Sequence, residues 1–212
     1  ADIVFDNFAA GTMQRLGLGA EDVRAINPQA IVLSCSGQGQ TGPHNLGKGG
    51  GGHYAALAGF NELTGWPDGE PGYLSAYTDF IAPRFNVPLL LAALDYRRRT
   101  GRGQSFDVSQ YETAVHWLAP WLIDYTANGH VAARTGNRQP NAAPHGVYRC
   151  LGEDDWLALA CPDAAAWRAL CAVVGDLDPS LDLDGRTASH DHIDEVITTW
   201  TCQRHKVDAT AQ

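Results

Sequence analysis

The sequence has no cysteine pattern that would support a disulfide framework or a zinc site. Its five cysteines are odd in number, scattered, and nowhere spaced as CxxC: Cys35, Cys150, Cys161, Cys171 and Cys202. Structural zinc sites and the disulfides of small secreted domains both need cysteines at close, repeated spacings. The five thiols are therefore expected to be reduced, which predicts a cytoplasmic protein.

Long apolar runs and an excess of positive charge are also missing. No stretch approaches the roughly 18 apolar residues that a membrane-spanning helix needs. The formal net charge is −9, whereas general nucleic-acid binding needs a basic face that displaces counterions from phosphates. With 44% hydrophobic and 18% charged residues, the composition is that of a globular protein without a membrane or nucleic-acid partner.

Glycine, by contrast, is abundant between Ser36 and Gly52. The stretch TGPHNLGKGGGG contains Gly42, Gly47 and Lys48 at the spacing of a phosphate-binding P-loop, and SGQGQTG before it contains GxGxxG. A P-loop needs Ser or Thr after its lysine, and the run of glycines here argues against a helix beginning there. The GxGxxG is followed by Pro-His-Asn and lacks the acidic residue expected about 20 positions later. Neither match therefore predicts a nucleotide site.

The order of elements predicts an α/β protein. Strands are expected at residues 1–5 and 30–34 with a helix at 20–26 between them, which suggests a Rossmann-like unit. Further helices are expected over residues 54–63, 80–99 and 108–128. The helix over 80–99 is expected to be kinked at Pro88. The helix over 108–128 is expected to start at a capping box of Asp107 and Gln110.

A polar stretch, TGNRQPNAA at residues 135–143, is expected to be a linker. Strands at 146–149 and 156–161 and a helix at 164–174 then predict a smaller α+β domain. The chain is accordingly divided into residues 1–107, a large domain; 108–140, a long helix and linker; and 141–212, an incomplete small domain.

Five ordered blocks carry a more specific signal. They are ADIVFDNFAAGTMQRLGLG at residues 1–19, IVLSCSGQGQTGP at 31–43, TGWPDG at 64–69, YTD at 77–79 and LLLAALDYRRRTGRGQSFDVS at 89–109. Together they resemble the family III CoA-transferases, the CaiB/BaiF family, over nearly all of residues 1–200. The resemblance implies a Rossmann-like large CoA-binding domain joined by long linkers to a small domain, in a homodimer of two interlocked chains. It also implies that this chain is the central portion of a longer protein.

Asp79 matches the catalytic aspartate of that family, at the usual distance before TGRGQ. The resemblance implies that its carboxylate attacks the thioester of an acyl-CoA and forms a covalent intermediate on the way to a carboxylic acid acceptor. Metals and permanently bound cofactors are not expected, because coenzyme A enters with the substrate. From its position alone, Asp79 can also be the N-cap of the long helix that follows, and both roles are compatible.

The resemblance also implies which residues bind CoA. They are Asn7, Phe8, Arg15, Leu16 and Lys48. Phe8 is suited to contact the adenine face, and Arg15 and Lys48 are suited to pair with phosphates. The alternatives are that Phe8 belongs to the core and that Arg15 and Lys48 are simply solvated.

Two loops are expected to contact the acyl group and the acceptor. Their candidate residues are Gly50, Gly51, His53, Tyr54, His145 and Gly146. The racemase branch of the family pairs a histidine with the aspartate, and Gly50 stands at that position here, which favours transfer over racemisation. His53 keeps an acyl-CoA racemase or isomerase open as an alternative, and a CoA-binding or dimerisation module without turnover is another.

Two other features are expected to be structural. His190 and His192 lie in SHDH without a partner cluster for a metal, which predicts a solvated loop. Trp117 and Trp121 are four residues apart on a predicted helix, a spacing typical of core or dimer packing.

Overall fold

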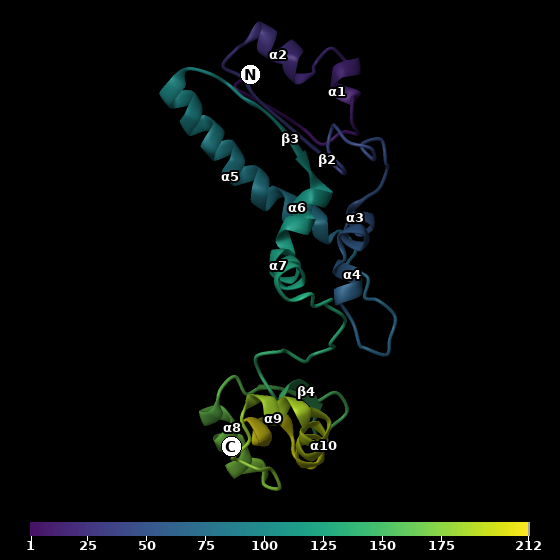
Figure 1. The fold of residues 1–212 in the computed structure, drawn as a ribbon, viewed down its shortest axis with the longest axis vertical. Helices are drawn as coiled ribbons and strands as arrows, with labels where there is room; N and C mark the ends of the chain where they lie inside the picture. Colours follow the sequence, from purple (N-terminus) through teal and green to yellow (C-terminus); the bar gives the residue numbers. More distant parts are fainter. Residues whose placement is uncertain (212) are drawn as a thin grey trace. The chain divides into compact units, whose positions relative to one another are not determined.

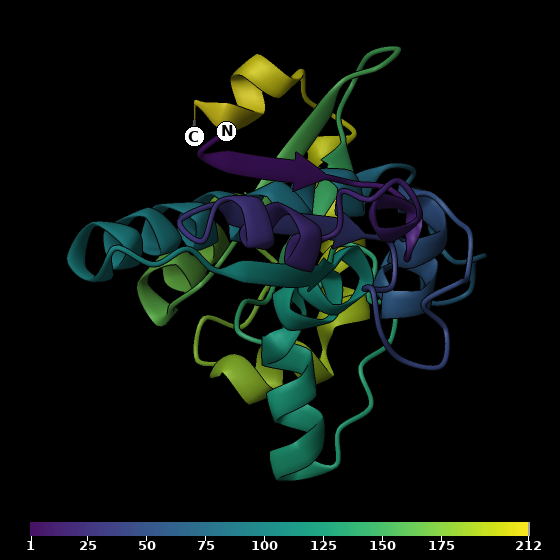
Figure 2. The ribbon, with the colours of Figure 1, turned by 90° about the horizontal axis from the view of Figure 1, so that it is seen from above.

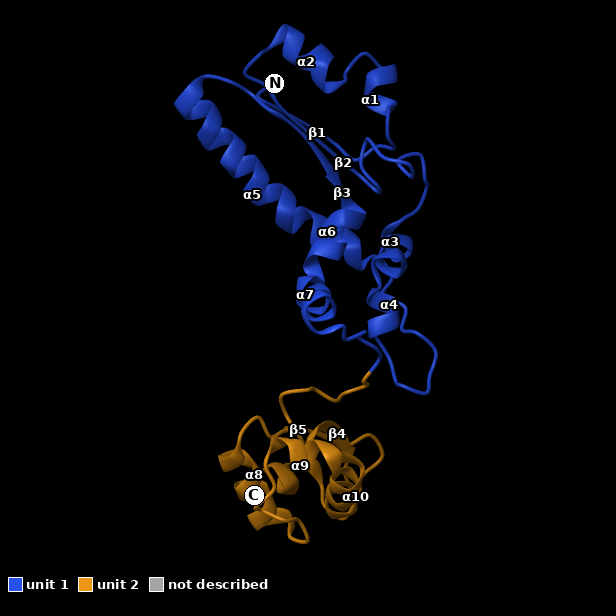
Figure 3. Cartoon of the chain, in the orientation of Figure 1, with its two compact units in different colours: residues 1–134 blue, residues 135–212 orange. Residues whose placement is uncertain are grey.

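The computed structural model describes residues 1–211, which form two compact units (Figure 3). The first unit covers residues 1–134 and the second begins at Thr135. The predicted linker thus starts where the second unit starts. Residues 108–128, where one long helix was predicted, belong to the first unit.

The elements of the first unit alternate between strands and helices (Figure 1). In chain order they are β1 (Ile3–Asp6), α1 (Thr12–Arg15), α2 (Ala20–Ile26), β2 (Ile31–Ser36), α3 (Gly51–Ala58), α4 (Phe60–Leu63), α5 (Tyr77–Thr100), β3 (Ser105–Ser109), α6 (Gln110–Trp117) and α7 (Ala119–Asn128).

The three strands of this unit form a parallel sheet in the order β1-β2-β3. Ile3 pairs with Ile31 at one side of β2, and Val32 pairs with Ser105 at the other. β2 is the central strand and is almost entirely buried, as its continuous apolar run predicts. Helices α1 and α2 lie on one side of the strands and α5 on the other, and the view from above has α2 in front of the sheet (Figures 1 and 2). The α/β prediction is confirmed.

Helix α5 packs against the sheet through its buried face. Ala82 shares a core cluster with Leu33 and Cys35 of β2 and with Val108 of β3. The helix runs through Pro83 and Pro88 and ends at Gly101, whose φ of 69° is the left-handed conformation that ends many helices. A second core cluster joins α5 to α3, α4 and α6.

Helix α3 corrects a prediction, because it begins within the run of glycines. Gly51 is its first residue and Gly50 its N-cap, whereas the sequence predicted that glycine would prevent a helix there. A Cβ at Gly51 would lie 2.8 Å from Ala76 Cα, and a Cβ at Gly52 would lie 2.7 Å from the Tyr73 hydroxyl. Close packing against the backbone thus requires glycine at position 51, whereas at position 52 the exposed Tyr73 side chain would have to move. This packing compensates for the low helix propensity of glycine.

The segment after α5 gives a second correction. The predicted helix over residues 108–128 is the end of strand β3 followed by α6 and α7. Ser109, not Asp107, caps α6, since its Oγ accepts a hydrogen bond from the Glu112 N–H at 3.2 Å. The alternating residues Ser105–Ser109 pair with β2, so sheet pairing overrides the local capping pattern.

The second unit is an antiparallel strand pair covered by helices. Its elements are β4 (His145–Arg149), β5 (Trp156–Ala160), α8 (Ala164–Val174), α9 (Leu183–Ala188), α10 (His190–Thr201) and α11 (Lys206–Thr210). Tyr148 of β4 packs with Trp167 of α8 and with Ile193 and Ile197 of α10. The smaller α+β unit was predicted, although α10 begins at His190, where a solvated loop was expected.

Within residues 1–211, none of the helices combines the length and apolar character needed to cross a membrane. The five cysteines are free thiols, and all except Cys202 are buried.

Candidate active site

The carboxyl ends of β1, β2 and β3 meet at one edge of the parallel sheet. α/β proteins bind ligands at this edge. β1 is followed there by Asn7 and Phe8, β2 by the glycine-rich loop from Gly37, and β3 by Gln110. The Tyr111 N–H donates to the Gly37 carbonyl oxygen at 2.9 Å, which ties the loop to the start of α6.

Asp79 is the third residue of α5, and its side chain is exposed. The alternative interpretation of Asp79 as the helix N-cap is wrong, because α5 begins at Tyr77 with Ala76 as its N-cap. A carboxylate in the first turn of a helix is stabilised by the helix dipole. Its Oδ1 accepts a hydrogen bond from Nε2 of Gln110, so Asp79 is held beside the residue that follows β3.

Gly51 allows the first turns of α3 and α5 to touch. A Cβ on Gly51 would lie 2.6 Å from Asp79 Oδ2. The hydroxyl of Thr78, which is fully buried, donates to the Gly51 carbonyl oxygen at 3.0 Å. Two helix N-termini therefore converge on the Asp79 carboxylate, and any side chain at position 51 would displace it.

Tyr54 is the buried aromatic residue of this cluster, with 4% of its surface exposed. A Cβ on Gly49 would lie 3.2 Å from the Tyr54 hydroxyl, and a Cβ on Gly37 would overlap the Tyr54 ring. Burial, and then the negative charge of Asp79, raise the pKa of Tyr54. The hydroxyl therefore stays protonated at neutral pH and can donate a hydrogen bond.

His53, the possible second acid/base group, is an exposed residue of α3. Its Nδ1 accepts a hydrogen bond from the Gly50 N–H at 3.2 Å. His53 thus caps the helix that carries it, and this contact occupies one of its two ring nitrogens.

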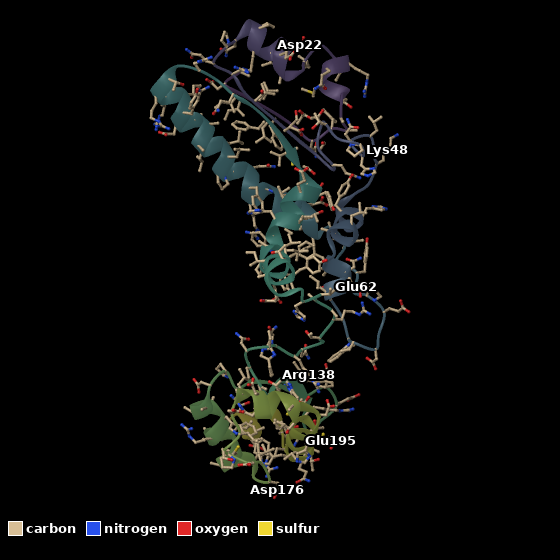
Figure 4. All side chains as sticks on the ribbon, in the orientation of Figure 1. Asp22, Lys48, Glu62, Arg138, Asp176 and Glu195 are labelled. Atoms are coloured by element: carbon tan, nitrogen blue, oxygen red, sulfur yellow. The ribbon has the colours of Figure 1, made fainter. Side chains whose placement is uncertain are left out.

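The loop between β2 and α3 is anchored by Gln40. Its N–H donates to Asp107 Oδ1 at 2.8 Å and its Oε1 accepts from the Gly11 N–H at 3.1 Å. Lys48 is exposed further along this loop, just before α3 (Figure 4). Within the described residues it has no ion-pair partner, so its ammonium group is available to an anion.

The other predicted CoA contacts lie between β1 and α2. Asn7, Phe8, Arg15 and Leu16 are all exposed. Phe8 is 52% exposed, so the alternative that it belongs to the core is wrong. Among residues 1–211, Arg15 donates only to the neighbouring Thr12 hydroxyl, at 2.9 Å, and it is exposed to solvent.

His145 and Gly146 begin β4 in the second unit. His145 Nδ1 is hydrogen-bonded to the Asn137 carbonyl oxygen, and a Cβ on Gly146 would lie 2.9 Å from the Tyr148 hydroxyl. Both residues thus have local contacts within their own unit, and their part in substrate binding stays a prediction.

Gln110 and Thr78 are site residues that the sequence interpretation missed. Gln110 was interpreted as part of a capping box, and Thr78 was noted only as a neighbour of Asp79 in the block YTD, without a role of its own. The signal for Gln110 was its place directly after a strand, but the helix predicted from Val108 concealed the strand end. No local signal marked Thr78, because its hydrogen bonds reach residues 27 and 32 positions away.

No group of three or more His, Cys, Asp or Glu side chains among residues 1–211 is placed to hold a metal ion. In the SHDH stretch, His190 is buried and Asp191 pairs with Arg138 at 2.5 Å. The chemistry available at the sheet edge is that of a carboxylate beside amide, hydroxyl and backbone donors.

Comparisons with known proteins identify CoA-transferases as relatives of this chain. A succinyl-CoA–D-citramalate CoA-transferase of Chloroflexus aurantiacus is 33% identical over 208 residues, which are 94% of this chain and 51% of that protein. An acetyl-CoA:oxalate CoA-transferase of Acetobacter aceti is 35% identical over 203 residues, 91% of this chain and 49% of that protein. The chain thus spans about half the length of these curated relatives.

A solved structure and a family profile cover the whole chain. The crystal structure of a CaiB/BaiF family protein from Brucella suis matches with a TM-score of 0.86 at 30% identity, covering 100% of this chain and 57% of that one. The profile of CoA-transferase family III matches residues 1–212. The chain whose exposed aspartate lies at the carboxyl edge of this parallel sheet therefore belongs to CoA-transferase family III.

Proposed function

We propose that the full-length protein transfers CoA from an acyl-CoA to a carboxylic acid, with Asp79 as the covalent nucleophile. One observation carries the proposal: the Asp79 carboxylate is exposed and is held by Gln110 where β3 ends. A nucleophile must be open to substrate, and the helix N-terminus beneath it favours negative charge.

The reaction proceeds through exchanges at two carbonyl carbons. A carboxylate oxygen of Asp79 attacks the thioester carbon, the C–S bond breaks, and CoA leaves as a thiolate, so that a mixed anhydride of Asp79 and the acyl group remains on the protein. The thiolate then attacks the Asp79 Cγ, and the original acyl group leaves as a carboxylate, which gives an aspartyl-CoA thioester. The acceptor carboxylate then attacks Cγ of the aspartyl-CoA thioester, which releases the CoA thiolate and gives a second mixed anhydride. The thiolate attacks the acceptor carbonyl carbon of this anhydride, so that the Asp79 carboxylate is regenerated and the acceptor leaves as its CoA thioester.

Oxyanions formed in these steps need hydrogen-bond donors. The first N–H groups of α3 have no partner within the helix, and Gly51 of that turn lies against Asp79. The protonated hydroxyl of Tyr54 lies in the same cluster. These groups are the proposed oxyanion donors, since donors fixed in advance stabilise developing charge without reorganisation.

The CoA moiety is proposed to bind across the sheet edge. Phe8 offers an exposed ring for the adenine, and Arg15 and Lys48 offer unpaired cations for phosphates. Asn7 and Leu16 complete this surface.

The names of the relatives suggest the substrate class. The two described above act on succinyl-CoA or acetyl-CoA and on a small carboxylic acid. A short acyl-CoA donor and a small carboxylic acid acceptor are therefore proposed here, with Gly50, His53, His145 and Gly146 as the residues that discriminate among acceptors.

The assembly and location also belong to the proposal. A homodimer of interlocked chains would cover exposed apolar side chains on α5 and α7, such as Phe80, Leu91, Trp121 and Ile123. Five free thiols are consistent with a cytoplasmic location.

The test is to trap the intermediate on the full-length protein. The protein is incubated with a panel of acyl-CoA thioesters, treated with hydroxylamine or borohydride, and mapped by mass spectrometry. An adduct on Asp79, absent in Asp79→Ala, is expected. Asp95→Ala is the matched control, because Asp95 is an exposed aspartate of the same helix that forms an ion pair with Arg99 and with no other residue that the structure describes.

Two other outcomes would contradict the proposal. Deuterium exchange at the acyl α-carbon without an adduct would indicate a racemase or isomerase. CoA binding without either reaction would indicate a non-catalytic module.

A further inference from the structure

We propose that Gln110 is the positioning residue of the nucleophile: its side-chain amide holds one oxygen of Asp79 and leaves the other to attack. Gln110 Nε2 lies within hydrogen-bond distance of two acceptors, Asp79 Oδ1 and Thr78 Oγ1, the latter at 3.0 Å. This inference rests on the proposed function, since it gives Gln110 a task in the chemistry of Asp79.

The orientation of the amide follows from its neighbours. The Thr78 hydroxyl donates its hydrogen bond to the Gly51 carbonyl oxygen at 3.0 Å, so the hydroxyl oxygen can only accept a hydrogen bond from Gln110. An ionised carboxylate is also only an acceptor. Both contacts therefore require N–H donors, and the NH₂ group of Gln110 supplies one hydrogen to each.

This arrangement distinguishes the two oxygens of Asp79. Oδ1 is engaged by Gln110, whereas Oδ2 lies on the side of Gly51, where a hypothetical Cβ would be only 2.6 Å away. Oδ2 is thus the attacking atom, and it faces the first turn of α3, where the N–H groups of Gly51 and Gly52 have no hydrogen-bond partner among residues 1–211. Gln110 itself is half-buried at the first position of α6, on a rigid helix start.

The hydrogen bond from Gln110 to Asp79 Oδ1 also has a role in the later steps of the reaction. When Oδ2 has formed the anhydride, Oδ1 is the carbonyl oxygen of the aspartyl group. Attack of the CoA thiolate on Cγ places negative charge on Oδ1, and the bond from Cγ to Oδ2 then breaks as the acyl carboxylate leaves. The Gln110 N–H already points at the atom on which this charge develops, which is the geometry of an oxyanion donor.

The expected kinetic effect follows from this position. Loss of one oxyanion donor typically lowers kcat by about 10²-fold or more. Gln110→Leu is therefore expected to lower kcat by about 10²-fold in the full-length protein, while the KM for acyl-CoA stays within about 3-fold because the proposed CoA contacts lie elsewhere. Gln203→Leu, at an exposed glutamine of the second unit, is the matched control and is expected to leave both constants unchanged.

Gln110→Glu tests the contact with Asp79, because it keeps the shape of the side chain and replaces the donor by a carboxylate. Two adjacent carboxylates resist ionising together, so the pair holds a proton to higher pH. The acid limb of the pH profile of kcat is expected to move to higher pH in this variant. The movement would show that the side chain at position 110 contacts the Asp79 carboxylate, since a carboxylate placed away from Asp79 would leave the profile unmoved.

Thr78→Val tests the structural alternative. If Gln110 served only to tie α6 to α5 through Thr78, this variant would lose as much kcat as Gln110→Leu; the proposal expects a loss at least 10-fold smaller. Equal losses, an unchanged kcat in Gln110→Leu, or an unmoved pH profile in Gln110→Glu would each overturn the inference. If the unmodified protein gives no Asp79 adduct, the proposed function fails first; if it gives the adduct and Gln110→Leu keeps its rate, only the inference fails.

Discussion

Gly50 and Gly51 are neighbouring residues with opposite surroundings. A Cβ added at Gly51 would meet Asp79 Oδ2 and the backbone at Ala76, whereas one added at Gly50 would meet nothing within 4 Å. Neither residue has a positive φ, so backbone conformation does not distinguish them. Contact with the nucleophile is what makes glycine necessary at position 51.

This difference predicts the behaviour of two alanine variants. Gly51→Ala is expected to move the Asp79 carboxylate, to lower kcat at least 10-fold, and to lower the free energy of unfolding by about 1–3 kcal/mol through overpacking. Gly50→Ala is expected to change both much less. Steady-state kinetics and urea unfolding of the two full-length variants provide the measurement. Equal effects of the two substitutions would show that the close approach of Gly51 to Asp79 affects neither kcat nor stability.

At the scale of elements, Asp194 connects α10 to Tyr148 and to Arg138 within the second unit. Its Oδ1 accepts a hydrogen bond from the Tyr148 hydroxyl of β4 at 2.6 Å, and its Oδ2 pairs with Arg138 at 3.0 Å. His190, one turn earlier and 4% exposed, has its Nε2 3.7 Å from Asp194 Oδ1 without a hydrogen bond. The titratable groups around His190 are thus Asp194, Arg138, Asp191 and His145.

The buried His190 predicts sensitivity to acid. Burial lowers the pKa of His190, and Arg138 and His145 add to this while Asp194 and Asp191 oppose it. The unfolded state therefore binds more protons than the folded state once the pH falls below about 6.5, and the free energy of unfolding falls with it.

His190→Gln is accordingly expected to flatten the loss of stability between about pH 7 and pH 5. His192→Gln is the control, because His192 is an exposed histidine of the same helix. Urea midpoints of the full-length proteins across this range are the measurement. A variant that loses stability as steeply as the unmodified protein would show that another group is responsible.

At the scale of the whole molecule, the exposed apolar residues of the first unit favour burial in an assembly. α7 has no buried residue, and Trp121, Leu122, Ile123 and Tyr125 are all exposed on it. Trp117 is exposed as well, so of the two packing roles predicted for Trp117 and Trp121, the core role is wrong. The proposed interlocked homodimer would cover such surfaces.

Interlocking makes a prediction of its own. Two closed, linked chains cannot separate without extensive unfolding, so isotopically labelled and unlabelled full-length proteins are expected not to form mixed dimers when incubated together. Native mass spectrometry would detect mixed dimers, and refolding a denatured mixture supplies the positive control. Mixed dimers within minutes under native conditions would mean an ordinary, exchangeable interface.

The sequence alone determined the features that depend on local pattern. The apolar run of β2, the helix Ala20–Ile26, the helix Ala164–Val174 and the left-handed glycine after α5 were all predictable, because burial periodicity and helix termini are encoded in neighbouring residues. Asp79 was singled out by the ordered blocks around it.

Only the tertiary structure decided how the site is assembled. The helix that begins at Gly51, the strand that ends at Ser109 and the contact between Gln110 and Asp79 each depend on residues far apart in the chain. The low helix propensity of glycine argues against a helix that begins at Gly51. The local capping pattern of Asp107 and Gln110 conceals the strand that ends at Ser109. Close packing of two helix N-termini against a sheet edge outweighs both preferences, because the burial and hydrogen bonds gained there exceed the small local costs of glycine and of a lost cap.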